Sequence, residues 1–153
     1  MDGTPEPKAG LSPFIFEGMD EAAVAALRDL YSDLSIDGEV LDLGGGGLEH
    51  FEVPPDDLVV LEAPPAEGTF DDVVCLLGAK NPSPEVLAEV ARVLKPGGHF
   101  VCSFVGGTDD TGRMRTLRRL FDGAPDFGGA ESDLRTSLTG SGDRLWAVWA
   151  KRA

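Results

Sequence analysis

The fold is decided by the stretch VLDLGGGG at residues 40–47, where an apolar run of strand length passes directly into four consecutive glycines. Glycine has no Cβ, so such a turn can take positive φ values and lets a ligand lie against the backbone. In an open parallel sheet, ligands bind beyond the carboxyl ends of the strands, where this turn would lie. The stretch therefore predicts a strand that leads into a ligand-binding turn.

An acidic residue follows the next predicted strand. The apolar run Leu58 to Leu61 lies between two Pro-Pro pairs, and its length and flanks are typical of a strand. Glu62 comes directly after this run, 20 residues past Asp42. A carboxylate in that position is placed to accept hydrogen bonds from two ribose hydroxyls. The two features together predict a site for a ribose-containing cofactor.

The spacing of the glycines argues against a nicotinamide cofactor. The dinucleotide pattern G-x-G-x-x-G would need glycine at position 49 or 50, and the chain has Glu49 and His50 there. The carboxylate of Glu49 would also repel a pyrophosphate. A cofactor without phosphate groups fits the turn better.

The remaining sequence alternates between helical and extended patterns. Apolar residues at three- and four-residue steps predict helices at 20–34, 83–94 and 109–121. Strands are predicted at 39–43, 58–61, 72–77, 99–105, 132–138 and 145–151. Continuous apolar runs are typical of strands covered on both faces. The pattern predicts an α/β fold with a mostly parallel sheet and an antiparallel C-terminal edge hairpin.

Composition narrows the class of protein. With 153 residues, 42% of them hydrophobic, the chain can form one domain, expected over 14–153 behind a flexible tail at 1–13. It carries 27 acidic and 13 basic residues, for a net charge of −14. This charge would repel a phosphate backbone and an anionic membrane surface, so neither nucleic acid nor membrane is an expected partner.

The two cysteines indicate a reducing environment. Cys75 and Cys102 lie inside predicted strands, where small thiols are usually buried, and no disulfide framework or metal site is expected. The first residues lack a basic segment followed by an apolar run, as a signal peptide would have. A cytoplasmic location is therefore expected.

Three segments resemble a known family. Residues 40–47 resemble the D-x-G-x-G-x-G motif of class I S-adenosylmethionine-dependent methyltransferases, and FDDVV at 70–74 resembles their fourth strand. EVARVLKPGGHFVCSF at 89–104 resembles the helix, turn and fifth strand that follow. Within this family the chain resembles the methyltransferase type 11-like branch, of which it would be a shortened bacterial or archaeal member. It is more distantly similar to the N-terminal domain of anamorsin.

The resemblance implies a Rossmann-like methyltransferase fold, S-adenosylmethionine as cofactor with S-adenosylhomocysteine as product, and methyl transfer to a small-molecule acceptor. It assigns Asp42, Gly44, Gly45 and Gly46 to the methionine and ribose part of the cofactor, and Glu62 to the ribose hydroxyls. A sulfonium is a cation without phosphate, which suits acidic surroundings.

Two departures from the family favour a second hypothesis. Leu48 replaces the family's third glycine, and only Ala63 to Thr69 link the second strand to the Phe70 segment, where the family has a helix, a strand and a further helix. Seven extended residues reach roughly 23 to 25 Å, and the crossing needs about 20 Å, so the link closes without a helix. The alternative is a non-catalytic scaffold or partner-binding domain that has lost full cofactor binding. The shortened sheet would expose apolar surface, which makes a homodimer a hypothesis to test.

The lost segment removes the acidic loop on the family's adenine side. Asp71 or Asp72 would be the nearest substitutes, although Asp72 is also explained as an ordinary residue at the start of a strand.

No catalytic residue is assigned, because methyl transfer from a sulfonium needs positioning more than acids and bases. Two weak candidates remain. His50 would serve as a base, or is simply a surface or helix-cap histidine. Asn81 would orient the acceptor, or belongs to an ordinary turn. The arginines from Arg113 to Arg119 are expected on a solvated helix face, with a partner's acidic surface as the alternative.

Overall fold

The computed structural model describes residues 21–43, 47–78, 80–106, 110–135 and 145–153. The predicted tail at 1–13 and the glycines Gly44, Gly45 and Gly46 lie outside the described residues. The elements are α2 (Glu21–Asp33), β1 (Glu39–Leu43), the 3-10 helix η1 (Gly47–His50), β2 (Asp57–Leu61), β3 (Asp72–Leu76), α3 (Pro84–Val93), β4 (His99–Val105), α4 (Asp110–Asp122), β5 (Glu131–Arg135) and β6 (Leu145–Lys151).

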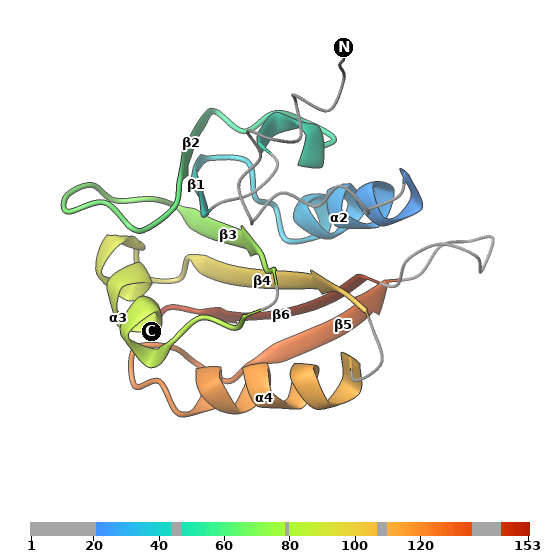
Figure 1. Cartoon of the computed structure of the whole chain (residues 1–153). Helices are drawn as coiled ribbons and strands as arrows, with labels where there is room; N and C mark the ends of the chain where they lie inside the picture. Colours follow the sequence, from blue (N-terminus) through green and yellow to red (C-terminus); the bar gives the residue numbers. More distant parts are fainter. Residues whose placement is uncertain (1–20, 44–46, 79, 107–109, 136–144) are drawn as a thin grey trace, which may run out of the picture.

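The described strands form one six-stranded sheet in the order β2-β1-β3-β4-β6-β5 (Figure 1). The first four strands of this order are parallel, whereas β6 runs antiparallel to both β4 and β5. The predicted α/β fold with an antiparallel C-terminal hairpin is therefore confirmed.

Helices cover both faces of the sheet. Because successive side chains of a strand point to opposite faces, β1 places Leu41 in a core with α3 and α4 and Val40 in a core with α2. The helix α3 begins where the sequence predicts it, since Ser83 caps it by accepting a hydrogen bond from the Val86 N–H.

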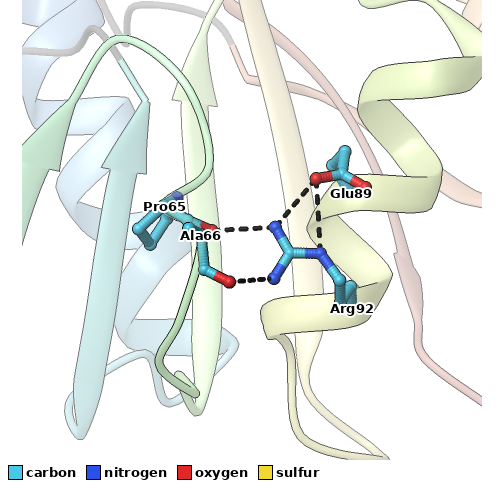
Figure 2. Close-up of polar contacts among 4 residues, drawn as sticks. All are labelled: Pro65, Ala66, Glu89 and Arg92. Atoms are coloured by element: carbon cyan, nitrogen blue, oxygen red, sulfur yellow. Dashed lines mark hydrogen bonds and ion pairs between the residues drawn. The ribbon is translucent and has the colours of Figure 1, made fainter.

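The link from β2 to β3 contains no helix, as predicted. Residues 62–71 are all described, and they form a loop from the end of β2 to the start of β3 (Figure 1). Figure 2 shows how Arg92 of α3 holds them: its guanidinium donates to the carbonyls of Pro65 at 2.8 Å and Ala66 at 2.7 Å. Glu89, one turn earlier, accepts from the same guanidinium at 2.8 Å. Arg92 thus fixes an extended link, whereas a crossover of this kind usually contains a helix that packs on the sheet.

β2 departs from the pattern of apolar runs that are covered on both faces, and its exposure agrees with the expectation that the shortened sheet exposes apolar surface at its edge. β3 is buried along its whole length, but β2 is the edge strand, with Val60 48% and Leu61 37% exposed. An extended link buries less of a neighbouring strand than a helix would, and the described chain places no strand beyond β2.

Asp71 joins three elements at the amino ends of the parallel strands. Its carboxylate accepts from the Glu39 N–H at 2.8 Å and from Lys95 Nζ at 3.0 Å. These two contacts, the backbone N–H first, lower the pKa of Asp71. Asp72 likewise accepts from the His99 N–H at 2.8 Å. The expectation that either residue substitutes for the family's adenine-side loop is wrong, because both lie at the edge opposite the glycine turn.

Gly98 is expected to tolerate no side chain. A Cβ there would lie 2.2 Å from the Asp71 carbonyl oxygen, so Gly98→Ala should lower the free energy of unfolding by about 1 to 3 kcal/mol. Gly129→Ala is the matched control, since a Cβ at Gly129 meets no atom within 4 Å. Urea unfolding of the two variants checks this, and equal midpoints would contradict the close approach of Gly98 to Asp71.

Arg92→Met is expected to loosen the link without unfolding the domain. Losing the hydrogen bonds to Pro65 and Ala66 should make a glutamate-specific protease cut after Glu67 severalfold faster. Glu89→Gln removes the ion pair but keeps the bonds to the link, and should leave the cleavage rate near that of the unmodified chain. Mass spectrometry of timed digests measures the rates, and an unchanged rate in Arg92→Met would refute the fixing of the link by Arg92.

Candidate functional site

The parallel register brings the carboxyl ends of β1 and β2 to the same edge of the sheet. Leu43 of β1 lies opposite Leu61 of β2, so the chain leaves the two strands at the same level. β3 and β4 end at the same edge, because both run parallel to β1. This edge, at the carboxyl ends of β1 to β4, is the site at which the sequence predicted a cofactor.

Asp42 holds Gly47, the last of the four glycines. Asp42 is only 2% exposed, and its Oδ2 accepts a hydrogen bond from the Gly47 N–H at 3.0 Å. Gly47 has a φ of +69°, and a Cβ on it would meet no atom within 4 Å. The buried carboxylate thus fixes a glycine that borders open space.

Glu62 directly follows β2, and its side chain is exposed. Its side chain is exposed because β2 is the outermost strand of the sheet on that side. A solvated carboxylate next to the turn can accept two hydrogen bonds from a ligand without first breaking contacts within the protein.

His50 lies in η1, immediately after the turn, and is not a surface residue, since it is 8% exposed. Burial lowers the pKa of its imidazole, and the neighbouring Glu49 carboxylate opposes this shift only in part. The Glu49 carbonyl accepts from Arg28 Nε of α2 at 2.7 Å, which ties η1 to that helix. His50 is therefore held beside the turn in the neutral form that accepts a proton.

Asn81 follows β3 and is fixed by an arginine of α4. Its Oδ1 accepts from Arg113 Nε at 2.8 Å, while Arg113 Nη2 donates to the carbonyls of Gly78 at 2.7 Å and Lys80 at 3.2 Å. The guanidinium also lies 4.7 Å from the centre of the Phe104 ring. Asn81 is therefore part of a braced loop rather than a free turn.

The prediction of a solvated arginine face on α4 is wrong for two of its members. Arg113 contacts the loop after β3, and Arg118 donates to Ser132 Oγ at 2.8 Å, whereas Arg115 and Arg119 are exposed. The sequence held a signal for Arg113, because it lies four residues before the fully buried Leu117 and so on the same helix face.

A pair of aromatic rings, one from β4 and one from β6, extends the contact between Arg113 and Phe104. The rings of Phe104 and Trp146 are nearly parallel, with centres 6.5 Å apart. Trp146 Nε1 donates to the Asp110 carboxylate at 2.8 Å, at the start of α4. The loop after β3, the start of α4 and the start of β6 are thereby connected by side-chain contacts.

Within the described ranges, no group of three or more His, Cys, Asp or Glu side chains is arranged to hold a metal ion. No helix in the same ranges is long and apolar enough to span a membrane.

The two cysteines are buried side by side, as the sequence predicts. Cys75 and Cys102 are register partners on β3 and β4, and both are free thiols. Burial, with a smaller effect from Asp42, raises the pKa of Cys75 to about 12, and burial also raises the pKa of Cys102. Neither thiol forms the reactive thiolate near neutral pH.

Ellman's reagent is accordingly expected to modify neither cysteine in the folded protein at pH 8, and both after unfolding in guanidinium chloride. Glu85→Cys, on the exposed face of α3, should react at once and serves as the control. Rapid loss of either native thiol without denaturant would contradict the burial.

Comparisons with known proteins identify the fold. No family model and no curated protein sequence matches the chain. Among solved structures, it is similar to the Burkholderia thailandensis 1,6-didemethyltoxoflavin-N1-methyltransferase bound to S-adenosylhomocysteine, with a TM-score of 0.56, 19% identity and coverage of 88% of this chain and 80% of that one.

Two further solved structures are similar to the chain. The precorrin-6y C5,15-methyltransferase of Geobacter metallireducens matches with a TM-score of 0.54, 15% identity and coverage of 98% and 97%. The 16S rRNA N2 G1207 methyltransferase of T. thermophilus, in complex with AdoMet and guanosine, matches with a TM-score of 0.51, 15% identity and coverage of 90% and 44%. The chain thus has a Rossmann-like methyltransferase fold, with an extended link between β2 and β3.

Proposed function

We propose that this chain is an S-adenosylmethionine-dependent methyltransferase that acts on a small-molecule acceptor. The observation that carries the proposal is the register of β1 and β2, in which Leu43 lies opposite Leu61 and the exposed Glu62 comes directly after β2. Structural neighbours with S-adenosylhomocysteine or AdoMet bound support the choice of cofactor. Membership of the type 11-like branch and the distant likeness to anamorsin remain part of this proposal.

The described residues fit such a cofactor. Gly47 borders open space, Asp42 fixes Gly47 through a hydrogen bond, and Glu62 offers an acceptor for ribose hydroxyls. In the proposed site, Gly44, Gly45 and Gly46 would allow the methionine part to approach the backbone closely. When bound, the cofactor supplies a methyl group on a good leaving group, so the protein needs mainly to align the acceptor with it.

Two side chains have proposed roles toward the acceptor. His50, buried and with a lowered pKa, would take the proton of a hydroxyl or amine acceptor. Asn81, whose Oδ1 is engaged by Arg113, would retain its amide N–H groups for the acceptor. A small molecule is favoured over RNA because of the net charge of −14, although one structural neighbour is an rRNA methyltransferase.

Calorimetric titration of the full chain with S-adenosylmethionine and S-adenosylhomocysteine tests the proposal. Glu62→Gln should weaken binding by about tenfold or more, since hydrogen bonds to a charged group contribute about 1.5 to 3 kcal/mol. Glu67→Gln, an exposed carboxylate of the link, should leave the affinity unchanged. Absence of binding at millimolar cofactor would overturn the proposed activity.

A non-catalytic partner-binding domain is the second candidate, favoured by exposed apolar residues around β2. Val53, Val60 and Leu61 are 64%, 48% and 37% exposed at the edge where the family has a further strand. A partner or a second copy of the chain would cover them. Tight cofactor binding that Gly46→Arg abolishes without unfolding would count against this candidate, and light scattering would test the homodimer.

A further inference from the structure

Arg113 is a half-buried cation of α4 whose hydrogen-bond acceptors are uncharged. They are two carbonyls and one amide oxygen, and none of the ion pairs among the described residues includes it. Burial is the main cause that lowers the pKa of its guanidinium, and Cys102 opposes that shift in part. An anionic ligand that reaches the guanidinium would bind it through a charge-assisted hydrogen bond.

Part of the Arg113 guanidinium makes no hydrogen bond to the described residues. Nε donates to Asn81, and Nη2 donates to Gly78 and Lys80, which leaves both N–H groups of Nη1 without an acceptor among the described residues. Across the same part of the chain, Ser103 Oγ is the only buried side-chain polar atom that lacks a partner, so Nη1 is within reach of solvent.

These donors are rigidly held at the proposed acceptor side of the site. Three hydrogen bonds and the Phe104 ring fix the guanidinium over the loop that follows β3. β3 is the direct neighbour of β1, and both strands end at the edge that holds the glycine turn. Because the side chain is already ordered, a ligand that binds Nη1 loses little free energy to restricting it.

We propose that Arg113 is a specificity-determining residue that binds a carboxylate of the methyl acceptor through Nη1. The inference rests on the proposed methyltransferase function, which it narrows to acceptors that carry a carboxylate. The carboxylate would accept a charge-assisted hydrogen bond from Nη1. The acidic surface of the chain repels anions in general. The fixed guanidinium of Arg113, beside the loop after β3, would therefore give an anionic acceptor a defined place to bind.

The binding test uses benzoate as the probe and benzamide as its neutral match. In nitrogen-15 spectra of the full chain saturated with S-adenosylhomocysteine, benzoate should shift the Arg113 Nε–Hε signal saturably, and benzamide should not. Arg119→Met, on the exposed side of the same helix, should bind benzoate normally. Arg113→Met should lose benzoate binding, while Arg113→Lys, which keeps the charge, should retain part of it.

The outcomes separate the two proposals. Equal responses to benzoate and benzamide, or benzoate binding that survives in a folded Arg113→Met variant, would overturn the role of Arg113 while leaving cofactor binding intact. Failure to bind cofactor, with benzoate still bound at Arg113 in the free chain, would overturn the methyltransferase function and leave the anion site. Once an acceptor with a carboxylate is identified, Arg113→Met should raise the KM for that acceptor about tenfold or more and change kcat far less.

Discussion

The link between β2 and β3 constrains the rest of this structure. Residues 62–71 must lead from the carboxyl end of one strand to the amino end of another that lies beyond β1. These ten residues would reach roughly 33 to 36 Å if fully extended, but a crossover that contains a helix normally takes a dozen or more residues. Arg92 fixes the link to α3, and β2 is left as a half-exposed edge beside the candidate cofactor site. The shortened crossover thus accounts for the exposure of both β2 and Glu62.

Most of the fold follows from local patterns, because strands and helices differ in their apolar period. The strands β4 and β6 begin and end where the apolar runs do, and Ser83 caps α3 as its position before a proline suggests. The exposure of β2 follows from the short link to β3 and not from its own apolar pattern. An apolar run indicates a strand, but the number of layers that cover it depends on segments far away in the chain.

The site was predictable where it depends on topology and not where it depends on side-chain contacts. Parallel pairing was enough to bring the carboxyl ends of β1 and β2 side by side. Topology could also have excluded Asp71, because a residue that starts a parallel strand lies at the edge opposite the ligand. The bracing of Asn81 by Arg113 needed the structure, since these residues are 32 positions apart and only packing of α4 against the sheet brings them together.

The two halves of the candidate site differ in how firmly they are built. On the cofactor side, the described residues provide one hydrogen bond from the turn to Asp42 and an exposed carboxylate after an edge strand. On the acceptor side, Arg113, Phe104, Trp146 and Asp110 form a connected set of ring and hydrogen-bond contacts. Three hydrogen bonds to the loop after β3 already order the guanidinium of Arg113. A ligand that binds there would lose little free energy to restricting side chains, so the acceptor side is the better prepared half of the site.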